Sequence, residues 1–156
     1  MGIRRLALHH SLEYTPDGGV DGSGAVATKK YLSEANQPAQ YIDTSCVTAG
    51  NEYEISFSYK ALDGDTTNVP SAKIRKSEWD SSSKVLSNAG RVDLTRTDIV
   101  SVGEWTTLKY LWTADEAAAN VDSLRLYIAG GSQRIMLDNV SFIKIGSGRR
   151  ERRRLK

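Results

Sequence analysis

The strongest constraint on the fold is an alternation of apolar and polar side chains with a period of two residues. The clearest example is "EYEISFSYKA", residues 52–61, in which every second residue is aromatic or aliphatic. Successive side chains of a β-strand point to opposite faces, so this pattern predicts an antiparallel strand with one buried face. The predicted buried face carries Tyr53, Ile55, Phe57 and Tyr59.

The same alternation recurs in two later segments. In "TLKYLWTA", residues 107–114, the predicted inward residues are Leu108, Tyr110 and Trp112. In "SLRLYIAG", residues 123–130, they are Leu124, Leu126 and Ile128. Trp105 is also assigned to the core. Further strands are predicted at residues 25–32, 40–45, 72–76, 90–94 and 135–145.

Turn-forming residues separate these segments, in clusters such as "TPDGGVDGSG", "SEWDSSS", "SNAG" and "SVGE". Only "ADEAAANVDS" is rich in helix-forming residues, and its length allows one turn of helix or a loop. Eight or nine short strands joined by turns are typical of an all-β sandwich or barrel.

Length and composition favour a single soluble domain. The chain has 156 residues, of which 39% are hydrophobic and 26% charged, and it contains no apolar run near the roughly 20 residues that span a bilayer. Its single cysteine, Cys46, cannot form an internal disulfide and is read as a small buried side chain.

Positive charge is concentrated at the carboxyl end. The last ten residues, "SGRRERRRLK", contain five arginines, one lysine and one glutamate, whereas acidic residues outnumber basic ones in the rest of the chain. We therefore divide the chain into a folded domain, residues 1–146, and a basic tail or linker, residues 147–156, which is expected to be disordered. The tail is either a polyanion-binding arm, a processing signal or a linker without a function of its own.

Four segments, taken together, resemble a known family. They are "DGSGAVATKKYL" (21–32), "VTAGNEYEISFSYKA" (47–61), "GEWTTLKYLWTA" (103–114) and "SLRLYIAGGSQRIMLDNVSF" (123–142). Their order and spacing are similar to those of jelly-roll carbohydrate-binding modules of families four, nine and twenty-two, within the galactose-binding-like sandwiches. The resemblance covers about residues 20–145 and implies a jelly-roll of two antiparallel sheets. It departs from the family at the first strand, where "RRLALHHSLEY" replaces the usual Asn-x-Gly-Phe-Glu.

The resemblance also implies a structural calcium ion held by the closing strand and the first loops. The available carboxylates are Asp138 on that strand and Asp17 and Asp21 in the glycine-rich loop "PDGGVDGSG", with Glu13 as a weaker candidate. Calcium prefers six to eight oxygen ligands, which carboxylates and backbone carbonyls supply. The alternative is that Asp17 and Asp21 only stabilise turns through their side chains.

Carbohydrate binding requires exposed aromatic rings with polar groups beside them. The aromatic candidates are Trp79, Tyr127 and Tyr41, with Tyr31 as a weaker one. The polar candidates at outward positions are Arg125, Arg75 and Lys109, followed by Ser58 and Gln133. The alternative is that these aromatic residues cover an edge of the sandwich without binding a ligand.

The sequence contains no motif of a nucleophilic, metal-dependent or phosphate-binding enzyme, and only two histidines. We therefore expect a non-catalytic polysaccharide-binding module of a larger secreted or cell-surface protein, fused to a catalytic or adhesive domain and without membrane contact. A structural or protein-interaction sandwich is the first alternative. A small glycan lyase or hydrolase is the second, because one fold supports many functions.

Overall fold

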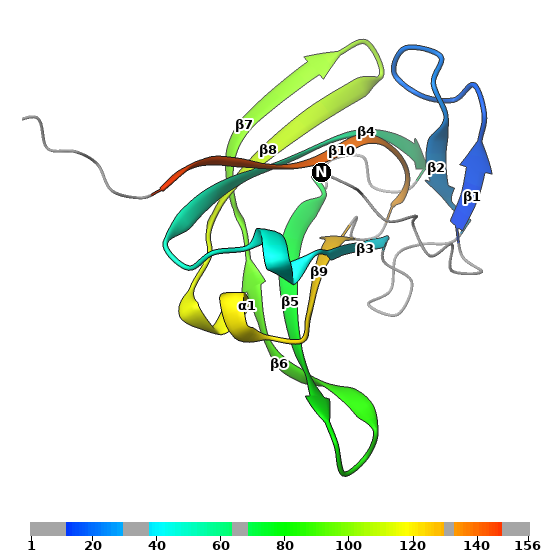
Figure 1. The fold of residues 1–156 in the computed structure, drawn as a ribbon. Coiled ribbons are helices and arrows are strands. Elements are labelled where there is room, and N and C mark those ends of the chain that lie inside the picture. Colours follow the sequence, from blue (N-terminus) through cyan, green and yellow to red (C-terminus); the bar gives the residue numbers. More distant parts are fainter. Residues whose placement is uncertain (1–11, 30–37, 64–68, 130–132, 148–156) are drawn as a thin grey trace, which may run out of the picture.

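The computed structural model describes residues 12–29, 38–63, 69–129 and 133–147. These residues form two antiparallel sheets (Figure 1). The first sheet contains, in spatial order, β1 (Leu12–Thr15), β2 (Ala25–Thr28), β10 (Arg134–Ser147), β4 (Asn51–Asp63), β8 (Trp105–Thr113) and β7 (Thr95–Val102). The second contains β3 (Ala39–Ile42), β9 (Ser123–Ala129), β5 (Ser71–Asp80) and β6 (Val85–Asp93). The helical elements are a 3₁₀-helix, η2 (Thr44–Cys46), and a five-residue α-helix, α1 (Glu116–Asn120). The predicted all-β jelly-roll sandwich is confirmed.

The core lies between the two sheets and contains the side chains that the alternation placed inward. All ten inward residues predicted on β4, β8 and β9 are buried, and they pack against Ala72 and Ile74 of β5. Aromatic stacking reinforces the contact within the core: the rings of Phe57 and Tyr110 stack with their centroids 5.8 Å apart. The Tyr110 hydroxyl donates a hydrogen bond to the Pro70 carbonyl at 2.6 Å, so this buried polar group is satisfied.

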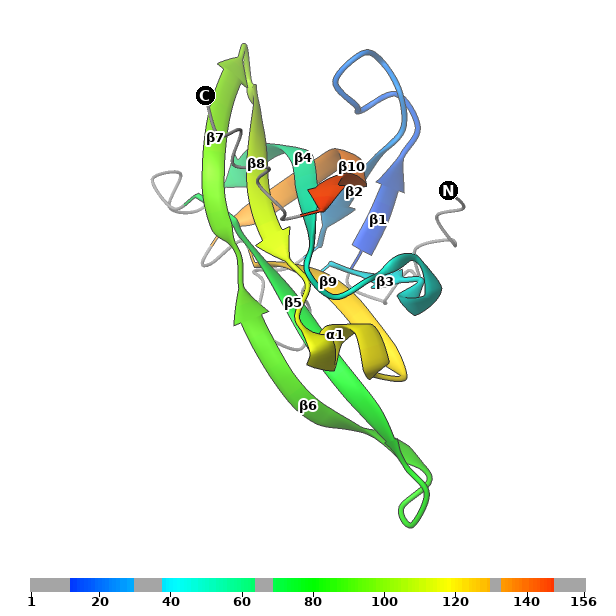
Figure 2. The same ribbon diagram turned by 60° about the vertical axis from the view of Figure 1, so that its left-hand side comes forward.

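Two hairpins extend beyond the sandwich at opposite ends of the molecule (Figure 2). One consists of β5 and β6, and the other of β7 and β8. No strand was predicted at β7, whose side chains are all exposed and therefore give no alternating pattern. Among the described residues, no helix has the length and apolar character needed to cross a membrane.

Three expectations about the strands are corrected. "SEWDSSS" is not a loop throughout, because β5 continues to Asp80 before the turn. "SNAG" lies inside β6, where Ala89 is an extra residue opposite β5 and Gly90 has a φ of +129°. This β-bulge explains the turn-like composition. Trp105 is only partly buried and lies outside the core cluster, because it begins β8 at the end of the projecting hairpin, opposite Val102.

Candidate functional site

The outer face of the four-stranded sheet gathers most of the predicted binding residues. Ile74, Leu124 and Leu126 point into the core, so their strand neighbours point away from it. The strand register aligns these outward residues in two adjacent rows. The first row is Tyr41, Arg125, Arg75 and Arg91, on β3, β9, β5 and β6. The second row, on the same strands, is Ala39, Tyr127, Lys73 and Asp93. We call this surface the binding face.

Tyr41, Arg125 and Tyr127 form a cluster on the binding face, the Tyr–Arg–Tyr cluster. The Arg125 guanidinium lies over the Tyr41 ring, with Cζ 4.3 Å from the ring centroid, and donates a hydrogen bond to the Tyr41 hydroxyl. Its Nη1 also approaches the Tyr127 hydroxyl at 3.4 Å. The guanidinium thereby holds the two rings in a fixed arrangement, while Tyr41 keeps 51% of its surface exposed.

Arg75 lies at the centre of the binding face and has arginines on both neighbouring strands. Arg125 is directly opposite on one side and Arg91 on the other. Among the described residues, no carboxylate or hydrogen-bond acceptor pairs with the Arg75 guanidinium, and its Nε is buried. The carboxylate of the neighbouring row, Asp93, pairs instead with Lys73 at 3.4 Å. A cation without an internal partner is available to an external ligand.

Trp79 lies further along β5, near the turn of its hairpin. Trp79 lies four residues after Arg75, so the alternation of β5 places both side chains on the same face. At 3.3 Å per residue, the two positions are about 13 Å apart. The Trp79 side chain is 55% exposed, and its backbone N–H donates to Asp122 Oδ2 at 2.6 Å. In the adjoining turn the Ser82 and Ser83 hydroxyls donate hydrogen bonds to the Asp80 carboxylate, and these bonds hold the pKa of Asp80 well below its usual range. Trp79 therefore extends the binding face rather than joining the Tyr–Arg–Tyr cluster.

The remaining predicted residues lie elsewhere. Lys109 is on β8, on the outer face of the six-stranded sheet, where it pairs with Glu54 at 3.4 Å. Ser58 faces the same way but is buried, and its hydroxyl lies 2.8 Å from that of Thr107. Gln133 is fully buried rather than outward, and Tyr31 lies outside the described residues.

Sequence reasoning missed Arg91 and Lys73. Both residues alternate with apolar neighbours on their strands, and this signal identifies outward positions. Their alignment with Arg75 and Tyr127 depends on the register across the β6 bulge, which the sequence does not reveal.

Asp138, the central calcium candidate, accepts hydrogen bonds from the first loop. Its Oδ2 accepts from the Val20 N–H and from the Ser23 hydroxyl, both at 2.9 Å, and its Oδ1 accepts from the Asn139 N–H at 2.7 Å. Asn139 has a φ of +52° and lies in a bulge of β10, which explains the Asp-Asn pair inside an otherwise apolar strand.

The three carboxylates proposed to hold calcium do not form one group in the described part of the chain. No group of three acidic, histidine or cysteine side chains suitable for a metal occurs among the described residues, which include Asp17, Asp21 and Asp138. Among the described residues, the Asp138 carboxylate accepts hydrogen bonds from two backbone N–H groups and from the Ser23 hydroxyl. This arrangement is that of a hydrogen-bonded loop, and the calcium ion at Asp138, Asp21 and Asp17 stays a prediction.

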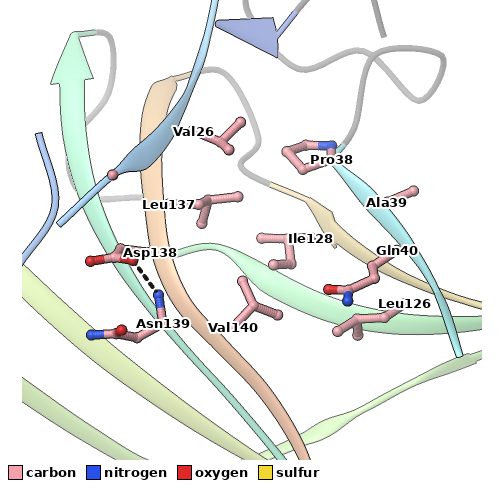
Figure 3. A pocket seen from close by; sticks show the side chains of 11 residues that line it. Val26, Pro38, Ala39, Gln40, Leu126, Ile128, Leu137, Asp138, Asn139 and Val140 are labelled. Atoms are coloured by element: carbon pink, nitrogen blue, oxygen red, sulfur yellow. Dashed lines mark hydrogen bonds between the residues drawn. The ribbon is translucent and has the colours of Figure 1, made fainter. Parts of the chain in front are cut away.

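Two apolar cavities lie between the sheets, beside β3 and β10. One of about 190 Å³ is lined by Val26, Leu126, Ile128 and Leu137, among others, and a second of about 280 Å³ adjoins it at Val140. Figure 3 shows these aliphatic side chains pointing into the first cavity, whereas those of Asp138 and Asn139 point away from it. The apolar walls suit the packing of side chains and offer few partners for the hydroxyls of a sugar.

Comparison with known proteins links the chain to carbohydrate-binding modules through its fold. No protein-family model matches the sequence, and no curated protein matches it significantly. Among solved structures, it is similar to the family 22 module of Clostridium thermocellum xylanase 10B, solved with a glycoside hydrolase family 10 module and xylohexaose, at 21% identity and a TM-score of 0.59. The match covers 86% of this chain but only 24% of that longer one.

Two isolated modules are covered almost completely. They are the first and second family 22 xylan-binding domains of Paenibacillus barcinonensis Xyn10C, at 17% and 14% identity and TM-scores of 0.58 and 0.63. The matches cover 88% and 90% of this chain and 84% and 91% of theirs. At these identities the likeness establishes a shared jelly-roll fold.

Proposed function

We propose that this protein is a non-catalytic carbohydrate-binding module and that polysaccharide binds on the outer face of the four-stranded sheet. The observation that carries the proposal is the Tyr–Arg–Tyr cluster on this face of a jelly-roll sandwich. Tyrosine rings offer flat apolar surfaces to pyranose rings, and guanidinium and hydroxyl groups donate hydrogen bonds to sugar oxygens. Arg125 orders both rings before a ligand arrives, which reduces the entropy cost of binding.

The comparisons support the proposal by analogy. Two of the similar structures are described as xylan-binding domains, and a third contains a catalytic module in the same chain. We infer a module of a larger secreted or cell-surface protein, in which it concentrates a catalytic or adhesive partner on polysaccharide.

The charges of the binding face support binding over catalysis. Glycoside hydrolysis uses two carboxylates about 5–9.5 Å apart. In the two described rows the carboxylate is that of Asp93, which already pairs with Lys73. Guanidinium groups, which stay protonated near neutral pH and therefore do not act as an acid or base, dominate the rest of the face.

Affinity electrophoresis through xylan, β-glucan, mannan and polygalacturonate tests the proposal. We expect retardation by at least one polymer, and about tenfold weaker binding in Tyr127→Ala and Tyr41→Ala. Trp79→Ala measures how far the site extends along the hairpin. Tyr14→Ala is the matched control, because Tyr14 is also exposed but lies on β1 of the other sheet.

Two outcomes would contradict the proposal. Unchanged mobility in every polysaccharide would favour a structural or protein-interaction role. Release of oligosaccharides from any of these polymers would indicate a glycan-degrading enzyme instead.

A further inference from the structure

The binding face contains a line of like charges on three neighbouring strands. Arg125, Arg75 and Arg91 are directly opposite one another on β9, β5 and β6, and we call them the arginine row. Neighbouring strands are about 4.8 Å apart, so three guanidinium groups originate within about 10 Å. Like charges directly opposite each other destabilise a sheet. A row of this kind therefore indicates a function outside the fold.

The partners of Arg125 and Arg75 among the described residues leave the charge of both guanidinium groups unneutralised. The two rows contain four cations and one carboxylate, and Lys73 already neutralises that carboxylate. Arg125 donates to tyrosine hydroxyls, which are neutral, and Arg75 has no partner among the described residues. The Nε atoms of both are buried without an acceptor in the same part of the chain. Two guanidinium groups thus have no carboxylate partner in residues 12–29, 38–63, 69–129 and 133–147.

We propose that the binding face takes an anionic polysaccharide, with carboxylate or sulfate groups of the glycan on the arginine row and sugar rings on Tyr41 and Tyr127. The planar guanidinium matches both anions because it can donate two parallel hydrogen bonds. Arg125 contacts both tyrosines and neighbours Arg75, so the stacking surface and the anion-binding groups are contiguous. This inference rests on the proposed carbohydrate binding and specifies its class of ligand.

Pairs of polymers that share a backbone and differ in charge test whether binding depends on the charge of the ligand. Polygalacturonate and its highly methyl-esterified form share a backbone and differ in their carboxylates; dextran sulfate and dextran differ in their sulfates. Binding of the 156-residue chain to each polymer is measured by isothermal titration calorimetry at fixed salt, together with neutral xylan and single-stranded poly(dT). The two charged arms distinguish a uronate from a sulfate ester.

Charge-matched variants isolate the site on the protein. We expect Arg75→Gln and Arg125→Gln to weaken binding of a charged glycan about tenfold or more, because each removes charge-assisted hydrogen bonds. Lys144→Gln removes the same charge from an exposed position on β10 of the other sheet and is expected to leave binding within about twofold. The basic tail is present in every variant, so its contribution cancels in the comparison.

The outcomes separate this inference from the function on which it rests. Equal affinity for the charged and uncharged member of each pair, with no effect of Arg75→Gln, would overturn the anionic ligand and leave carbohydrate binding standing. No binding to any glycan, charged or neutral, would overturn both. Binding of poly(dT) as tightly as the charged glycans, with the same dependence on Arg75, would assign the row to polyanions in general and overturn the glycan.

Discussion

The outer faces of the two sheets differ in how far their cations are paired, although the four-stranded sheet also has an ion pair, between Lys73 and Asp93. On the six-stranded sheet, Lys109 pairs with Glu54 at 3.4 Å and Lys60 with Glu104 at 2.5 Å. On the four-stranded sheet, Arg75 and Arg125 have no carboxylate partner among the described residues. The hydroxyls differ in the same way: those of Ser58 and Thr107 bond to each other, whereas the buried Ser123 hydroxyl on β9 has no partner in the described part of the chain.

Under the proposed function, this difference separates a face that serves the fold from a face that serves a ligand. Groups that satisfy one another within the chain contribute to stability and have little left to offer a partner. Polar groups without a hydrogen-bond or ion-pair partner inside the protein are expected at functional sites, where an external ligand binds them. Substitutions on the two faces should therefore change stability in opposite directions.

The largest effect on stability is expected at Asp138, the best-satisfied carboxylate of the six-stranded sheet. Asp138→Ala removes the acceptor of three hydrogen bonds and is expected to lower the free energy of unfolding by about 2 kcal/mol, measured by urea denaturation. The melting temperature in EDTA and in calcium tests the predicted ion separately. If EDTA lowers it in the wild type but not in Asp138→Ala, Asp138 binds calcium and its role as a hydrogen-bond acceptor alone is refuted.

A smaller effect on the free energy of unfolding is expected at the ion pair that Lys76, the residue after Arg75, forms with Asp115. Lys76, on the inward face of β5, pairs with Asp115 at 3.1 Å. The Ala118 N–H, followed by Lys76, holds the pKa of Asp115 below its ordinary value of 3.8. The unfolded chain therefore binds this proton at higher pH than the folded one, so stability is lost as the pH falls from about 5 through the folded-state pKa.

Asp115→Asn tests this pH dependence. Asparagine can still cap α1, but the ion pair is lost, and we expect a cost of about 1 kcal/mol at neutral pH. Urea denaturation across this pH range should show a shallower acid loss in the variant. An equally steep loss in both proteins would place the titrating group elsewhere.

The smallest effect on the free energy of unfolding is expected at Arg75. A substitution there also tests the difference between the two faces most directly. Arg75→Gln relieves repulsion from two neighbouring arginines and is expected to raise the free energy of unfolding by a few tenths of a kcal/mol, up to about 1 kcal/mol. Ser58→Ala on the other face should instead lower it by about 1 kcal/mol. Thermal and urea denaturation measure both. Clear destabilisation by Arg75→Gln would mean that the arginine row serves the fold.

Much of the architecture could be predicted from the sequence because burial imposes a local pattern on each strand. The alternation in β4, β8 and β9 identified their inward residues correctly. It failed where neither face is buried, as in β7, and where a bulge adds a residue, as in β6. In both cases packing no longer imposes a period of two on the sequence.

On the binding face, some features could be predicted from the sequence and others depend on the tertiary structure. By itself, the sequence determined that Arg75, Arg125, Tyr127 and Lys109 point away from the core, because alternation separates inside from outside. Only the tertiary structure decided that Lys109 belongs to the other sheet and that Arg91 completes a row with Arg75 and Arg125. The reason is physical: the side of a strand is set by its own residues, whereas its sheet and register are set by hydrogen bonds to strands distant in the chain.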